Sequence, residues 1–148
     1  MSAPTLTTVR LILRRPSPAD AGLAADFWQS ERAEFVGGDA SRFRAWSNFA
    51  AMLGHWEILG FGLWAVTEKG DGTILGLVGP YCPDGWPEHE LGWLLFKGAE
   101  GKGIAYEAAR AARDDARARL GWKEIVSYIA PGNERSVKLA ERLGGVLD

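Results

Sequence analysis

The 148-residue chain has one cysteine, no excess of positive charge and no long hydrophobic run. Its lone Cys82 cannot form an internal disulfide, which is typical of a reducing, cytoplasmic location. With 17 basic and 19 acidic side chains, it lacks the basic excess of a nucleic-acid-binding protein. The longest apolar candidate, Leu91 to Phe96, is far shorter than the roughly 18 residues of a membrane helix. Residues Met1 to Thr5 lack the apolar region of a signal peptide. We therefore expect neither a nucleic-acid nor a membrane partner.

Several catalytic motifs are also missing. No string matches the phosphate-binding loop G-x-x-x-x-G-K-[ST], and no G-x-S-x-G places a nucleophilic serine. His55, His89 and Cys82 lack the spacing of metal ligands, so we expect no metal. Cys82 beside Pro83 is a candidate nucleophile, with an unreactive loop thiol as the simpler interpretation. No set of residues for nucleophilic catalysis stands out.

The composition is that of a globular protein, with 47% hydrophobic residues and no internal repeat or linker. This predicts a single domain over residues 1–148. Seven tryptophans indicate a deep aromatic core or an aromatic-lined pocket.

Periodicity predicts the elements of the amino-terminal half. Alternation predicts a strand over Thr7 to Arg14, and Ser17-Pro18-Ala19-Asp20 is typical of a helix start. That helical spacing continues to Glu31. The next expected elements are a helix over Ser41 to Ile58 with one aromatic face, strands over Gly62 to Thr67 and Thr73 to Val78 joined by a glycine-rich turn, a loop over Gly79 to Pro87, and a strand over Glu88 to Phe96.

The carboxy-terminal half predicts a long helix over Ile104 to Leu120, whose inner face carries small alanines. A strand over Glu124 to Ala130 and a last helix from Asn133 to Gly144 follow. Together these elements predict an α+β fold with a mixed, mostly antiparallel sheet flanked by helices.

A glycine-rich loop joins the strand ending at Phe96 to the long helix. Its glycines let consecutive backbone N–H groups turn inward, and the helix N-terminus and Lys102 add positive charge, which would seat a phosphate. The alternative is a tight strand-to-helix turn. A dinucleotide motif G-x-G-x-x-G starting at Gly101 fails, because Tyr106 stands at its third glycine.

The loop resembles the pyrophosphate loop of the GNAT N-acetyltransferases, whose pattern is [QR]-x-x-G-x-[GA]. Gly103 and Ala105 occupy the small positions, while Glu100 departs from the pattern by standing where Gln or Arg is usual. The string GKGIAYEAARA is similar to the RimJ/RimL-like branch. Further similarities to that branch, in order along nearly the whole chain, are Glu90-Leu91-Gly92-Trp93, Asn133 to Val137 and Arg142-Leu143-Gly144.

The resemblance implies a GNAT-like fold and direct transfer of an acetyl group from acetyl-CoA to a primary amine in a ternary complex. The acceptor would be a protein N-terminus or a small molecule. In the family, the strand before the loop carries a bulge and splays from its neighbour, where the pantetheine arm inserts. The cofactor-binding residues implied are Trp93, Leu94 and Leu95 for pantetheine, Glu100, Gly101, Lys102, Gly103, Ile104 and Ala105 for the pyrophosphate, and Asn133. A CoA-binding regulatory module without turnover and a nucleotide-binding domain are the alternatives.

Glu90 is the first candidate for the base that deprotonates the amine, with Glu88 and His89 next. Alternatively, all three lie at an exposed strand end. The resemblance implies Ser136 as the acid for the departing thiolate, with Tyr128 as the alternative. Asn133 would hold pantetheine or position Ser136, although helix capping alone also accounts for this pair.

The acceptor pocket is expected between the first two helices, the hairpin and the loop over Gly79 to Pro87. Trp46, Trp56 and Trp86 are candidate lining residues, with core packing as the alternative. Family members usually continue past Leu143-Gly144 with two more strands, whereas only Gly145 to Asp148 remain here. We expect either a missing tail or a homodimer in which a partner subunit completes the sheet.

Overall fold

The structure is a computed structural model that describes residues 5–38 and 40–148. Residues 1–4, part of the segment in which we expect no signal peptide, lie outside this description. Five strands form one antiparallel sheet in chain order. They are β1 (Leu6–Thr7), β2 (Leu11–Arg14), β3 (Trp64–Glu68), β4 (Gly76–Tyr81) and β5 (Glu90–Leu95).

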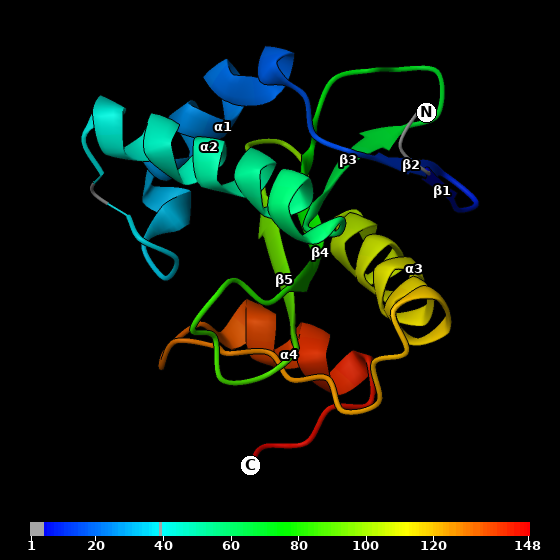
Figure 1. The fold of residues 1–148 in the computed structure, drawn as a ribbon. Helices are drawn as coiled ribbons and strands as arrows, with labels where there is room; N and C mark the ends of the chain where they lie inside the picture. Colours follow the sequence, from blue (N-terminus) through cyan, green and yellow to red (C-terminus); the bar gives the residue numbers. More distant parts are fainter. Residues whose placement is uncertain (1–4, 39) are drawn as a thin grey trace.

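Helices cover both faces of the sheet (Figure 1). A short 3-10 turn, η1 (Pro18–Asp20), leads into α1 (Ala21–Trp28), and a second turn, η2 (Glu31–Ala33), precedes α2 (Arg42–Leu59). These elements pack on one face, and α3 (Ile104–Arg119) packs on the other. The last helix, α4 (Glu134–Arg142), lies near the end of β5. The predicted α+β class is confirmed.

Two hydrophobic cores follow from alternation along the central strands. Trp64, Val66 and Val78 point to the core under α3, whereas Ala65 and Leu77 point to the core under α1 and α2. All five side chains are fully buried. A strand with both faces covered needs apolar residues at every position, which explains the continuous apolar runs of β3 and β4.

The long helix α3 packs through small residues, as its sequence predicts. Ala108, Ala109 and Ala112 have no exposed surface and let the helix lie against β4 and β5. Gly103 is its N-cap, with φ of 74°, a left-handed conformation that glycine adopts without a steric penalty.

The buried face of α2 differs from the predicted aromatic face. Ala45, Phe49 and Trp56 are buried, whereas Phe43 and Trp46 are 77% and 55% exposed. The spacing of three and four holds for both sets, so periodicity alone did not choose between them. Contact with α1 decides which face is covered.

Two predicted strands are corrected near the amino terminus and in β4. The strand expected over Thr7 to Arg14 is a tight hairpin, because the Thr8 backbone N–H donates to the Leu11 carbonyl at 2.9 Å and reverses the chain. The second strand of the central hairpin begins at Gly76 rather than Thr73 and continues to Tyr81. Its last residues, expected in a loop, pair with β5 instead.

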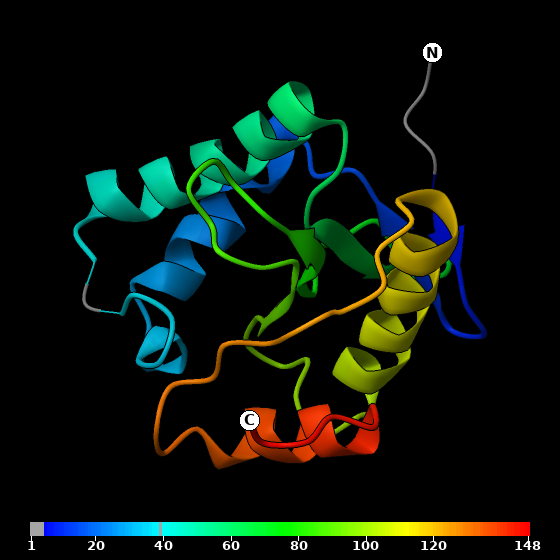
Figure 2. The same cartoon turned by 60° about the horizontal axis from the view of Figure 1, so that its bottom comes forward.

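The strand expected over Glu124 to Ala130 is not formed. This segment runs extended from α3 to α4 past β5 (Figure 2), but it pairs with β5 through one parallel bridge, between Glu90 and Val126. The Leu91 N–H donates to the Val126 carbonyl, and the Val126 N–H donates to the His89 carbonyl. Pairing stops there because the side chains of Glu90 and Ser127 bind the next backbone groups.

Candidate active site

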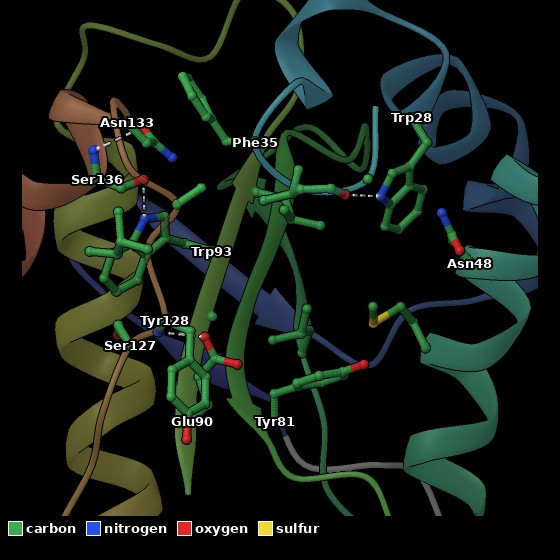
Figure 3. A pocket seen from close by; sticks show the side chains of 18 of the residues that line it. Trp28, Phe35, Asn48, Tyr81, Glu90, Trp93, Ser127, Tyr128, Asn133 and Ser136 are labelled. Carbon is green, nitrogen blue, oxygen red and sulfur yellow. Dashed lines mark hydrogen bonds between the residues drawn. The ribbon is translucent and has the colours of Figure 1, made fainter. Parts of the chain in front are cut away.

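A cavity of about 560 Å³ opens beside β5, between α1 and α2 on one side and α4 on the other (Figure 3). Four of the sequence-predicted residues that line it are Glu90, Trp93, Asn133 and Ser136, which come from β5 and from the start of α4. Leu94, Trp86 and Tyr128 line it as well. Residues distant in the sequence therefore meet in one concave space, the usual form of a ligand site.

Glu90 is the buried carboxylate of this cavity, with 8% of its surface exposed. Its Oε1 accepts a hydrogen bond from Trp86 Nε1 at 3.1 Å, and its Oε2 accepts one from the Tyr128 backbone N–H at 2.9 Å. Burial raises the pKa of Glu90 above its ordinary value, and the two N–H donors oppose that rise. A carboxylate with a raised pKa is a stronger base than an ordinary one.

The contact with Tyr128 also explains why β5 and the following segment separate. A parallel ladder continuing from the Glu90–Val126 bridge would join the Tyr128 N–H to the Leu91 carbonyl. Instead the Glu90 side chain takes the Tyr128 N–H, and Ser127 Oγ donates to the Leu91 carbonyl at 2.7 Å. Two side chains thus replace the next rung of the ladder. Beyond this point the chains diverge, and the cavity occupies the gap.

The other candidate bases point elsewhere. Glu88 accepts a hydrogen bond from Tyr128 Oη at 2.8 Å, which raises the pKa of Tyr128 to about 12. His89 is exposed and stacks on Trp122, with ring centroids 4.1 Å apart. Neither Glu88 nor His89 lines the cavity.

A hydrogen-bonded chain links β5 to α4. Trp93 Nε1 donates to Ser136 Oγ at 3.1 Å, and the Ser136 N–H donates to Asn133 Oδ1 at 3.3 Å (Figure 3). Asn133 therefore caps α4 through the backbone of Ser136, while the hydroxyl of Ser136 is free of that role. Helix capping therefore involves the backbone N–H of Ser136, whereas the proposed acid role involves its hydroxyl.

The three tryptophans expected at the acceptor pocket lie in different places. Trp86 lines the cavity and packs edge-to-face on Tyr81 and Tyr128. Trp56 is 2% exposed and donates Nε1 to the Leu63 carbonyl in the core, and Trp46 is on the outer surface of α2. Neither Trp46 nor Trp56 lines the cavity.

Glu100 in the glycine-rich loop is paired with two arginines. Arg32 Nη2 lies 2.5 Å from its Oε1, and Arg135 of α4 contacts its Oε2. The Lys102 carbonyl accepts a hydrogen bond from Arg10 at 2.8 Å. The acidic residue that departs from the family pattern is thus neutralised by neighbours from other parts of the chain.

Residues 10–146 match the family model of the acetyltransferase (GNAT) domain. The chain belongs to the GNAT acetyltransferase family. A crystal structure of an acetyltransferase from Agrobacterium tumefaciens is 41% identical, with a TM-score of 0.92, and the match covers 100% of this chain and 86% of that one. A GNAT-family protein from Bordetella pertussis is 26% identical with a TM-score of 0.78, covering 95% and 87%.

Among curated proteins, YkkB of Bacillus subtilis, described as uncharacterized, is 32% identical over 87 residues. That match covers 57% of this chain and spans about half, 51%, of YkkB.

One feature that the GNAT resemblance implies is absent from the described residues. The pairing of β4 with β5 advances one residue at a time from Gly76–Leu95 to Tyr81–Glu90, so no bulge interrupts β5. The expected splay is present on the edge of β5 that faces away from β4. There β5 diverges from the segment that follows α3, because Glu90 and Ser127 end the pairing.

The chemistry of the loop fits the diphosphate of acetyl-CoA, the cosubstrate of GNAT enzymes. Gly98, Gly101 and Gly103 all have φ between 74° and 87°. The N–H groups of Ile104 and Ala105 at the start of α3 form no hydrogen bond to another described residue, as expected of a helix N-terminus. With Lys102 beside them and Glu100 neutralised, these residues would hold a diphosphate, and Trp93, Leu94 and Asn133 would border the pantetheine arm.

Leu95 does not line the cavity. The described residues bring no three His, Cys, Asp or Glu side chains together as a metal-binding group. Among the helices of the described residues, none is long and apolar enough to cross a bilayer.

Sequence reasoning missed several lining residues. Trp28 and Phe35 come from α1 and the chain after η2, Asn48 from α2, and Tyr81 from the end of β4. Asn48 was detectable as a polar position within an aromatic helix, and Tyr81 would have been included had β4 been extended past Val78. No sequence signal identified Ser127, because its role depends on where the pairing of β5 stops.

Proposed function

We propose that residues 1–148 form one acetyl-CoA-dependent N-acetyltransferase domain that transfers acetyl directly to a primary amine. One observation carries this proposal. The buried Glu90 carboxylate and the Ser136 hydroxyl come from distant parts of the chain and line the same cavity, beside the splayed edge of β5. Membership of the GNAT family supports the same conclusion.

When bound, acetyl-CoA supplies an acetyl group already activated as a thioester, so no protein nucleophile is needed. Glu90 removes a proton from the acceptor ammonium, directly or through water, because only the neutral amine is nucleophilic. Its raised pKa keeps the carboxylate basic enough for this step. The walls of the cavity orient the amine toward the thioester.

Ser136 holds the proton for the leaving thiolate at Oγ. Trp93 Nε1 donates into this oxygen, so the serine's own hydrogen points away from Trp93 and is available to another acceptor. The cap formed by Asn133 holds the backbone of Ser136 in place. Tyr128 is less suited to the same step, because its hydroxyl hydrogen is already donated to Glu88.

We propose the RimJ/RimL-like branch on the strength of the sequence motifs from Gly101 to Ala111 and around Asn133. A cytoplasmic location stays a prediction from the single cysteine. Homodimerisation also stays a prediction, which light scattering at several concentrations would test.

Two measurements test the proposal. In thermal unfolding, acetyl-CoA should raise the melting temperature while ATP and NAD should not, because only a ligand of the folded state stabilises it. Thiol release with a panel of amines then separates an enzyme from a CoA-binding module. Stabilisation by ATP or NAD but not by acetyl-CoA would contradict the family-based function, and stabilisation without turnover would leave a binding module.

A further inference from the structure

The cavity has a second half that the acetyl-transfer chemistry does not use. Trp93, Asn133 and Ser136 lie on one side, and residues of α1 and α2, among them Trp28 and Asn48, form the opposite side (Figure 3). Glu90 lies on β5, at the boundary between the two. An acceptor amine that reaches Glu90 must therefore place the rest of its body against the α1 and α2 side.

The walls of this acceptor half are mostly apolar. Trp28, Val36 and Met52 line it. The one polar atom of the Trp28 ring, Nε1, already donates to the Val36 carbonyl at 3.2 Å. These walls offer an acceptor body van der Waals contact and little hydrogen bonding, so they favour an apolar body.

Two polar side chains interrupt these walls on α2. Arg44 and Asn48 both line the cavity and are four residues apart, so they lie on one face of the helix, one turn from each other. Neither side chain is in a hydrogen bond or ion pair with another described residue. Among the described lining residues, Arg44 is the only lysine or arginine and Glu90 the only carboxylate.

We infer that the acceptor is a compact primary amine with an apolar body and an anionic group, which Arg44 and Asn48 bind while the amine faces Glu90. This inference rests on the proposed function. A guanidinium pairs with a carboxylate or a phosphate through two parallel hydrogen bonds, and an amide adds a further donor. The charged side chains among the described lining residues, one negative and one positive, match an acceptor that carries one charge of each sign.

The same charges disfavour other amines. A polyamine or a lysine-rich peptide would bring several positive charges to a cavity whose described lining residues offer one carboxylate. It would also place positive charge beside Arg44. Unpaired like charges in a partly closed site lower affinity strongly, so such acceptors should be poor substrates.

The test compares matched pairs of amines with and without an anionic group. Phenylalanine and phenylalaninamide differ beside the amine, and 4-(aminomethyl)benzoate and 4-(aminomethyl)benzamide differ across the ring. The matching phosphonate of the second pair distinguishes carboxylate from phosphate chemistry, and spermidine represents polyamines. We expect kcat/KM for at least one anionic amine to exceed that of its amide by about tenfold, mainly through KM, because a charge-assisted hydrogen bond has that worth.

Two variants complete the design. Arg44→Met should reduce this preference toward one. Arg42→Met is the control, because Arg42 is on the same helix but pairs with Asp26 at 2.7 Å and does not line the cavity, so it should keep the preference. Equal rates for anionic and neutral amines, a preference that survives Arg44→Met, or faster transfer to spermidine would each overturn the inference while leaving acetyl transfer intact. Absence of stabilisation by acetyl-CoA, together with no turnover of any amine, would contradict the proposed function itself.

Discussion

Tyr128 gives its backbone N–H to the Glu90 side chain at 2.9 Å, in place of the Leu91 carbonyl that a continuing parallel ladder would use. The Glu90 carboxylate therefore has two structural roles. It ends the pairing of β5 with the next segment, which leaves room for the cavity, and it is held inside that cavity as a buried group with a raised pKa. Glu90 is therefore both the residue that ends the strand pairing next to the cavity and the candidate base.

Replacing Glu90 with Gln should lower kcat by about a hundredfold, the usual contribution of a general base. In the wild type, the rate should rise with pH through the raised pKa of Glu90, because the base acts in its deprotonated form. The variant should lack this limb in a pH–rate profile. Glu88→Gln is the control, since it removes the charge of a carboxylate that does not line the cavity and leaves Glu90 in place. An unchanged limb in Glu90→Gln would assign the base to another group.

Glu90 should also make the free energy of unfolding depend on pH, and this stability should fall with rising pH whereas the rate rises. A pKa that is raised on folding means that the native state holds the proton more tightly than the unfolded chain. The contribution of Glu90 to the free energy of unfolding is therefore greatest below its ordinary pKa and is lost as pH rises through the folded value. Denaturant unfolding across pH should show this difference between the wild type and Glu90→Gln.

Ser136→Ala should lower turnover by about a hundredfold with little loss of stability. The cap of α4 uses the backbone N–H of residue 136, which alanine keeps. Asn133→Ala is the complementary variant, because it removes the cap and should cost about 1 kcal/mol of stability. Single-turnover rates and thermal unfolding separate the two effects. Full turnover in Ser136→Ala would show that another group protonates the thiolate.

Glu100→Gln should strengthen acetyl-CoA binding about twofold to threefold, since it removes a negative charge beside the loop and leaves Arg32 and Arg135 without a carboxylate partner. Arg135 is mostly exposed, which limits the size of the change. The gain should shrink between 50 and 200 mM salt, concentrations at which screening grows. Isothermal titration with acetyl-CoA measures it, and weaker binding in Glu100→Gln would mean that the carboxylate organises the loop.

Each ring nitrogen of His55 makes one hydrogen bond, and each bond should contribute to stability. Nδ1 lies 2.7 Å from the Phe61 carbonyl, and Nε2 accepts the Cys82 N–H at 3.0 Å, so the ring is neutral with its proton on Nδ1. Burial lowers the pKa of His55, and stability should therefore fall as pH drops below about 6.5, where the unfolded chain takes up the proton first.

Two variants of His55 test this assignment. His55→Gln places an acceptor near the Nε2 position and should keep most of the stability without the pH dependence. His55→Asn reaches only the Phe61 side and leaves the Cys82 N–H unsatisfied, at a cost of about 1 to 3 kcal/mol. Because His55→Gln gives up the contact with the Phe61 carbonyl, equal stability of the two variants would show that the Cys82 contact contributes no more than the Phe61 contact.

Gly76→Ala should destabilise the pairing of β4 with β5. A Cβ on Gly76 would lie 2.2 Å from the Leu94 carbonyl oxygen, so β4 and β5 would have to separate at a cost of about 1 to 3 kcal/mol. Gly72→Ala is the matched control, because its Cβ would meet no atom within 4 Å. Denaturant unfolding compares the two, and equal midpoints would contradict the close approach.

The sequence by itself determined the features that depend on neighbours along the chain. The small face of α3, the left-handed Gly103 before it and the cap at Asn133 follow from residue type and helical spacing. The family also followed from the sequence, because its motifs are short continuous strings.

Only the tertiary structure decided which side chains meet. Trp93 and Ser136 are 43 residues apart, and Glu90 and Tyr128 are 38 apart, so neither contact has a periodic signal. Residue type did not separate Trp56 in the core from Trp86 in the cavity, since both are tryptophans and only their tertiary contacts differ. The segment after α3 has the composition of a strand, yet it leaves β5 after one bridge because Glu90 and Ser127 satisfy the next backbone groups. Local sequence sets the preference of each segment, and competition between side chains and backbone for the same hydrogen bonds decides the site.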